Sequence, residues 1–316
     1  MMLTSFALSL LCCQPVLDSD VPDYRPAGSL KGALTFGPDG GFEKLLASWS
    51  QRMKSYYPDV RGLEAPRGPA QTTPQALLLG TARCGMSWKP WSVREIDAFR
   101  ETTGSLPVEL VVGADAVVVV VHPDNPVRGL KLDELDGIFS STLNRSDHAI
   151  HTWGEFKLGN PWKGKPLHAF GVASASTPAS PAREVFVERV LQAGKFSDDV
   201  KMLASPAAVL QAVAEDPLAV GFVPFSAGAK GARAVPILAS EGALIELSGE
   251  NILNLTYPLA WRIRITYRHD REVSLDSIQR EFFAFILSRD GQTIVAEEGY
   301  VPISGPLARK QTKLVK

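Results

Sequence analysis

The run Val108-Glu-Leu-Val-Val-Gly-Ala-Asp-Ala-Val-Val-Val-Val-Val121 is a long, largely apolar and β-branched segment, broken by Gly113-Ala-Asp115. Continuous segments of this kind suit strands that are buried on both faces of a mostly parallel sheet. The run is long for one strand, since most strands have about 5–6 residues. We therefore expect a strand that crosses from one lobe of a two-lobed protein into the other.

Segments with helical spacing alternate with short strand candidates on both sides of this run. A second β-rich segment, residues 256–267, is the candidate for a second crossover strand. The apolar residues 75–79 and the turn region 80–85 loosely repeat the strand, turn and helix order of residues 32–57. Alternation of strands and helices predicts an α/β fold with open parallel sheets and covering helices. The expected helices are residues 42–57, 91–101, 130–139, 183–192, 207–214 and 275–287, and the other strands are 32–36, 168–173 and 219–224.

A chain of 316 residues suits two domains, at about 150 residues for each. We expect residues 1–30 to be an export signal and a linker, lobe one to be 31–114 plus 256–316, and lobe two to be 115–255. The crossovers near Gly113 and Tyr257 would then act as hinges. Residues 310–316 are expected to form a frayed tail.

The N-terminus has a short apolar run, residues 3–11, followed by Cys12-Cys13-Gln14. The run resembles the hydrophobic part of a secretory signal, although no Lys or Arg precedes Arg25. It is far shorter than the ~20 residues that a membrane span requires. We interpret it as a truncated or atypical export signal, or as a lipoprotein signal with Cys12 or Cys13 acylated. A misassigned start codon is the alternative. The expected location is periplasmic or extracytoplasmic, with or without a lipid anchor.

The composition and the motifs exclude several classes of function. Apolar residues make up 45% of the chain and the net charge is -1, so no basic surface is predicted for nucleic acid or anionic lipid. Cys84 is the one cysteine outside the leader and is expected to be a small buried thiol. The sequence has no GxSxG, HExxH, P-loop or GxGxxG motif. We therefore expect no enzyme activity, no metal and no cofactor, and any anion site must be built locally.

Three small polar loops are candidates for such a site, namely residues 37–41, 80–87 and 174–180. Open α/β sheets bind ligands where loops leave the carboxyl ends of strands, and helix N-termini attract anions. The alternative is that these residues only cap helices or form turns, and that Arg183 is a solvated helix residue. The candidate ligand groups are Gly37, Asp39, Gly40, Gly41, Ser87, Ser176, Thr177, Ser180 and Arg183.

A composite of motifs carries a resemblance to a known family. The most specific part is residues 113–126, followed by the helix candidate 130–139 and by Trp153. Together with residues 80–87, 219–223, 257–259 and 291–302, these segments resemble the substrate-binding proteins of phosphate ABC transporters over roughly residues 31–304. The resemblance implies the type II periplasmic-binding-protein fold, with two Rossmann-like lobes joined by two crossover strands. It also implies a monomer that binds inorganic phosphate or a related oxyanion between the lobes and delivers it to the permease.

The departures from that family fall in the three loops. Residues 37–41 contain no hydroxyl where the family has a serine or threonine, and Val172 stands near an expected arginine. Arg83 stands where many relatives have an aspartate, which would favour a more highly charged anion if its side chain faced the cleft. Two alternatives therefore stay open: a degenerate relative that serves as a sensor or interaction module, and an enzyme with a phosphatase-like activity that uses the cleft.

Overall fold

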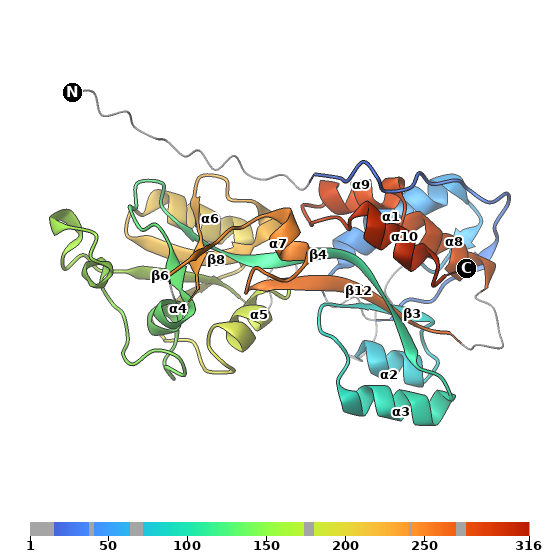
Figure 1. The fold of residues 1–316 in the computed structure, drawn as a ribbon, viewed down its shortest axis with the longest axis horizontal. Helices are drawn as coiled ribbons and strands as arrows, with labels where there is room; N and C mark the ends of the chain where they lie inside the picture. Colours follow the sequence, from blue (N-terminus) through green and yellow to red (C-terminus); the bar gives the residue numbers. More distant parts are fainter. Residues whose placement is uncertain are drawn as a thin grey trace.

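The computed structural model describes residues 16–37, 41–63, 72–173, 180–239, 242–269 and 276–315. Two α/β lobes are joined by two long strands, β4 (Pro107–Val121) and β12 (Ala260–Arg268), which run side by side through both lobes (Figure 1). This architecture confirms the predicted fold, including the strand at residues 108–121 that crosses between the lobes.

The crossing strands form the centre of one mixed sheet. Its strand order is β3-β12-β4-β8-β6-β7, and β9 also pairs with β4. The chain leaves lobe one along β4 and returns along β12, so these neighbours are antiparallel. The expectation of parallel sheets is therefore wrong at the centre, although β6 is parallel to both β7 and β8. The remaining strands of this sheet are β3 (Cys84–Ser87), β6 (His168–Val172), β7 (Lys201–Leu203), β8 (Ala219–Pro224) and β9 (Arg233–Val235).

Each lobe has its own hydrophobic core, and the crossing strands contribute to both cores. On β4, Val112 belongs to the core of lobe one and Ala114 to the core of lobe two. On β12, Ile263 belongs to the core of lobe one and Trp261 to the core of lobe two. The predicted lobe boundaries, residues 31–114 plus 256–316 and residues 115–255, stay a prediction, as does the hinge role of the crossovers.

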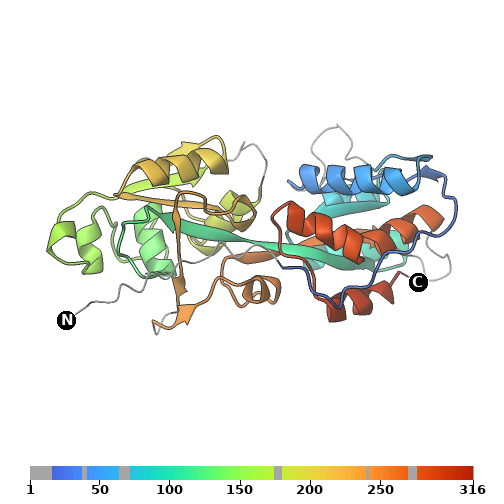
Figure 2. The ribbon, with the colours of Figure 1, turned by 90° about the horizontal axis from the view of Figure 1, so that it is seen from above.

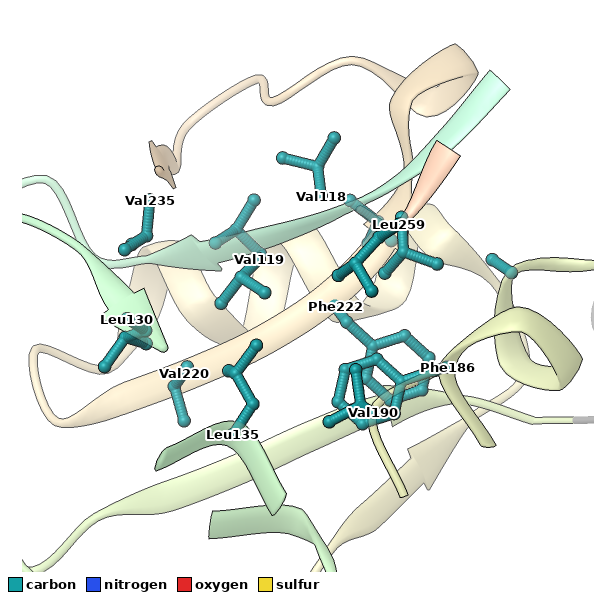
Figure 3. Close-up of a cluster of buried hydrophobic side chains, with 14 of the residues drawn as sticks. Val118, Val119, Leu130, Leu135, Phe186, Val190, Val220, Phe222, Val235 and Leu259 are labelled. Atoms are coloured by element: carbon teal, nitrogen blue, oxygen red, sulfur yellow. The ribbon is translucent and has the colours of Figure 1, made fainter. Parts of the chain in front are cut away.

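The core of lobe two gathers β-branched residues of β4 against aromatic side chains (Figure 3). Phe186 and Phe222 stack with ring centroids 4.2 Å apart and an interplanar angle of 16°. Lobe two contains the helices α4 (Leu132–Phe139), α5 (Ala182–Arg189), α6 (Pro206–Glu215) and α7 (Gly249–Leu253), the 3-10 turns η1 (Trp153–Phe156), η2 (Asn160–Trp162) and η3 (Phe225–Ala227), and the short strands β5 (Leu130–Lys131), β10 (Ile237–Leu238) and β11 (Leu244–Ile245).

Lobe one packs amphipathic helices around the other half of the crossing strands. Trp49 and Met53 lie on the buried face of α1, as the sequence spacing predicts. The helices are α1 (Glu43–Tyr56), α2 (Thr73–Leu78), α3 (Val93–Thr103), α8 (Ser277–Ile286), α9 (Arg289–Glu297) and α10 (Gly305–Thr312), beside the short strands β1 (Gly32–Ala33) and β2 (Val60–Arg61). Each predicted helix lies within three residues of an observed one at both ends.

The interpretation of residues 75–79 as a strand-like segment is wrong, whereas the turn expected at residues 80–85 is found at residues 79–83. Residues 73–78 form α2, and the strand is instead β3 at residues 84–87. Thr72 begins the helix with a capping box to Gln75, and Pro74 stands in its first turn. Both are helix-start signals that outweigh the short apolar run.

The two ends of the described chain pack on lobe one. Residues 16–30, expected to be part of a linker, form a strap along this lobe, with the hydroxyls of Tyr24 and Tyr57 both donating to Glu281. At the other end Val315 is buried, and Gln311 pairs with the backbone of Val111 in β4. The expectation of a frayed tail is therefore wrong for residues 310–315. Within the described ranges, no helix is long and apolar enough to cross a membrane.

Candidate functional site

The two lobes meet where the turn after β3 faces α5. The ammonium of Lys89 in lobe one lies 2.8 Å from a carboxylate oxygen of Glu188 on α5. Trp88, the residue before Lys89, is half-buried and packs against the cores of both lobes. Arg189, the last residue of α5, donates hydrogen bonds to the carbonyls of Pro258 and Ala260 beside the start of β12. The predicted second loop and the helix after the third loop are thus brought together across the lobes.

Ser87 is the candidate ligand residue that brings a hydroxyl close to this contact. It is the last residue of β3 and pairs with Arg264 of β12. Its Oγ donates to the carbonyl of Lys89 at 3.2 Å. A hydroxyl has one donor that can rotate and two acceptor lone pairs. Ser87 could therefore turn its hydrogen toward an anion in exchange for one backbone contact.

The first loop is anchored to the second. The N–H of Gly37 donates to the carbonyl of Cys84 at 2.7 Å, so this amide is already used inside lobe one. A Cβ at position 37 would lie 3.3 Å from the Cβ atoms of both Ala76 and Ala82, which explains the glycine by close packing. Gly41 is half-buried and stands immediately before the N-terminus of α1. Asp39 and Gly40 lie outside the described residues.

Cys84 is fully buried, which confirms the predicted small buried thiol. Burial raises the pKa of this thiol well above its usual value. A thiol that stays protonated is a poor nucleophile, and it packs here as a small apolar side chain.

The third loop ends at the N-terminus of α5. Ser180 Oγ accepts a hydrogen bond from the N–H of Ala182, the first residue of α5, at 3.2 Å, while the N-cap residue is Pro181. The guanidinium carbon of Arg183 lies 5.2 Å from the centre of the Phe196 ring in lobe two. Ser176 and Thr177 lie outside the described residues. The ligand roles of the nine candidate residues stay predictions.

Arg83 does not take part in this contact. Its guanidinium forms an ion pair with Asp276, the N-cap residue of α8, and its carbonyl accepts from the side chain of Gln279 at 3.2 Å. In Figure 1, α8 lies at the end of lobe one that is remote from lobe two. The hypothesis that Arg83 selects a more highly charged anion is therefore not supported.

Cationic side chains that the sequence interpretation missed surround the contact. Burial lowers the pKa of Arg264, Glu109 opposes that change, and the charges of Arg262 and Arg189 lower it further. Burial also raises the pKa of Glu109, against the effect of Arg264. Arg262 and Arg264 are two residues apart in an expected strand, so the sequence already predicts that they share one of its faces. This spacing is the signal that could have indicated a cationic site. Positive charge exceeds negative charge among the groups at this contact, which are Lys89, Arg189, Arg262, Arg264, Glu109 and Glu188.

A cavity of about 600 Å³ lies beside α7. Asp18 of the strap, Glu250 of α7 and Arg262 of β12 line it together with residues 301–304 and Leu307 of lobe one. Figure 2 shows α7 on one side of the crossing strands and α1 on the other. Since both lobes contribute to its walls, movement of one lobe relative to the other would change the volume of this cavity.

Comparison with known proteins identifies the family. Residues 26–290 match the model of the PBP superfamily domain. The chain is 30% identical over 299 residues to the phosphate-binding protein PstS of Pseudomonas aeruginosa, covering 94% of this chain and 91% of the relative.

Solved structures show the same fold. One is described as a possible phosphate binding protein from Planctomyces limnophilus, with a TM-score of 0.71, 19% identity and coverage of 90% of this chain and 98% of the other. Another is an ABC-type phosphate transport receptor from Vibrio cholerae, with a TM-score of 0.63, 19% identity and coverage of 85% and 100%. The chain therefore belongs to the PBP superfamily and, within it, to the family of the substrate-binding proteins of phosphate ABC transporters.

Proposed function

We propose that this protein binds inorganic phosphate between its two lobes and delivers it to an ABC transporter in the membrane. The observation that carries the proposal is the 30% identity with PstS of Pseudomonas aeruginosa, which extends over 94% of this chain. Phosphate binding and hand-over to a permease, an extracytoplasmic location and a monomeric state all belong to the proposal. Enzyme activity is not part of it, because relatives of this kind are binding proteins.

The arrangement of the lobes supports an anion site between them. The N-terminus of α1 follows the first loop, and the N-terminus of α5 follows the third. Helix N-termini present free N–H groups and the positive end of the helix dipole, so they bind phosphate without a full cationic partner. Ser87 and the excess of cationic groups near Arg264 add a donor and a favourable field.

The proposed ligand groups are mainly backbone amides and hydroxyls of the three loops. A buried phosphate needs nearly all its oxygens paired, since each unmet partner costs about 1–3 kcal/mol. With Gly37 engaged by Cys84, the first loop would contribute through residues 39–41. Ser87, Ser176, Thr177 and Ser180 would supply hydroxyls, and Arg183 would contribute only by leaving the Phe196 ring.

The alternative of a degenerate relative without a ligand is less well supported. It rests on the sequence of the loops alone, whereas the identity with a phosphate-binding protein runs through both lobes. Isothermal titration calorimetry of the full chain with phosphate, arsenate, sulfate and molybdate separates the two. We expect saturable binding of phosphate and arsenate. Binding of sulfate or molybdate alone would replace phosphate by another oxyanion, and binding of none would leave the degenerate relative.

A further inference from the structure

The ion pair between Lys89 and Glu188 joins the two lobes directly. Lys89 follows β3 in lobe one, Glu188 lies in the last turn of α5 in lobe two, and the charged atoms are 2.8 Å apart. Within the described part of the chain, every other ion pair either lies inside one lobe or ties the N-terminal strap to lobe one. Lys44 and Glu298 form a pair of the first kind, inside lobe one, with the charged atoms 2.7 Å apart. Separation of the lobes must therefore break this particular pair.

The turn that carries Lys89 is held firmly on lobe one. The guanidinium of Arg264 donates to the carbonyl of Trp88 at 2.8 Å, which fixes the backbone of the turn to β12. The indole of Trp88 then reaches the core of lobe two, and the Lys89 ammonium lies 5.4 Å from the centre of its ring. Lobe one thus presents an aromatic contact to the core of lobe two and a charge to Glu188 of α5.

We propose that Lys89 and Glu188 form a latch that holds the lobes together before any ligand enters. Since the walls of the proposed phosphate site are the loops beside these residues, the pair acts as a positioning element for that site, and this part of the inference rests on the proposed function. The latch is weak enough to open. The two side chains are 62% and 48% exposed, and exposed pairs of this kind shift an equilibrium by about fivefold at most. Salt screens such pairs, so high ionic strength also favours separated lobes.

Amide hydrogen exchange of the ligand-free protein tests the latch. When the open state recloses faster than its amides exchange, the exchange rate at a buried contact scales with the population of the open state, however small that population is. We expect Lys89→Ala and Glu188→Ala each to speed exchange in peptides that cover residues 84–92 and 182–191 by about two- to fivefold in phosphate-free buffer. Added salt should speed the wild type toward the same rate and change the variants little.

Two further variants separate a latch from a general loss of structure. Lys44→Ala breaks an ion pair of the same kind inside lobe one, and exchange at the interlobe peptides should stay at the wild-type rate. The double variant Lys89→Glu/Glu188→Lys keeps opposite charges in exchanged positions and should restore slow exchange. Single variants that exchange like the wild type, or a double variant as fast as either single one, would overturn the latch.

The latch and the proposed function fail separately. Exchange is measured without phosphate, so a chain that binds no phosphate in calorimetry can still show the latch. Conversely, normal phosphate binding with no change of exchange in the single variants removes the latch and leaves the function.

Discussion

Asp115 accepts hydrogen bonds from both the backbone N–H and the hydroxyl of Ser226, at 3.1 and 2.8 Å, where β4 passes between the lobes. The carboxyl is fully buried, and a further N–H, from Ala116, donates to it at 2.8 Å. The carbonyl oxygen of Ser226 in turn lies against Gly299 of lobe one. A Cβ atom at position 299 would be only 2.4 Å from that oxygen. A buried carboxyl thus fixes the turn of lobe two that touches lobe one.

The first prediction concerns the pH dependence of stability. Burial raises the pKa of Asp115 to about 7, against the opposing hydrogen bonds from Ser226 and Ala116. In the unfolded chain the carboxyl ionises near pH 4. The folded protein therefore holds the proton between about pH 4 and pH 7, and this group's contribution to stability falls as the pH rises through that range, by up to about 4 kcal/mol.

Replacement by asparagine tests this contribution. Asp115→Asn keeps the shape and removes the charge, so its melting temperature relative to the wild type should rise from pH 5 to about pH 7 and level off above it. Thermal unfolding at a series of pH values measures it. A difference between variant and wild type that stays constant with pH would show that Asp115 is ionised throughout.

Ser87→Ala should weaken phosphate binding without unfolding the protein. The hydroxyl donates to the carbonyl of Lys89 at 3.2 Å, and the proposed site uses it as a donor to phosphate. Loss of a hydrogen bond to a charged group costs about 1.5–3 kcal/mol, which is roughly a 10- to 150-fold weaker affinity. Calorimetry measures the change.

Arg83→Ala is the matched control, because Arg83 pairs with Asp276 at the far end of lobe one. This variant should bind phosphate as the wild type does. Equal affinities of Ser87→Ala and the control would remove Ser87 from the site.

Phe222→Ala should strongly destabilise lobe two. The side chain is fully buried and stacks against both Phe186 and Phe196, with ring centroids 4.2 and 5.9 Å away. Truncation of a buried phenylalanine costs about 3–5 kcal/mol, through lost burial and the cavity that remains. Phe222→Leu refills much of that volume and should lose considerably less. Urea unfolding gives both values, and equal losses would contradict a cavity contribution, because they would assign the whole cost to the lost ring contacts.

Gln311→Ala tests whether the C-terminal segment supports β4. The side chain donates to the carbonyl of Val111 at 2.6 Å and accepts from its N–H at 2.5 Å, as a neighbouring strand would. Its removal leaves two backbone groups of β4 without partners, and we expect a loss of about 1–3 kcal/mol in urea unfolding. The exposed change Lys310→Ala on the same helix should cost little. Similar losses for both variants would contradict a specific role of Gln311.

Much of the fold could be predicted from the sequence because its strongest signals are local. The run at residues 108–121 is mostly apolar and β-branched, which favours a strand buried on both faces, and its length favours two lobes around it. Helices with an apolar stripe, such as α8, follow from spacing alone. The antiparallel pairing of β4 and β12 did not follow, because it depends on where the chain returns, which no local pattern encodes.

The site was harder to predict because it depends on partners far apart in the sequence. Glycine and serine content marked the loops, yet Gly37 is explained by packing against Ala76 and Ala82, and Arg83 by its pair with Asp276. Lys89 and Glu188 carry no motif, and only the fold brings them within 2.8 Å.

Hydrogen exchange of the full chain with and without phosphate tests the central claim most directly, since it reports both binding and its place. The account predicts slower exchange in peptides that cover residues 36–43, 84–92 and 174–186 when phosphate is added, with no change in α10. Unchanged exchange in all three segments at saturating phosphate, or protection confined to other parts of the protein, would contradict an anion site between the lobes.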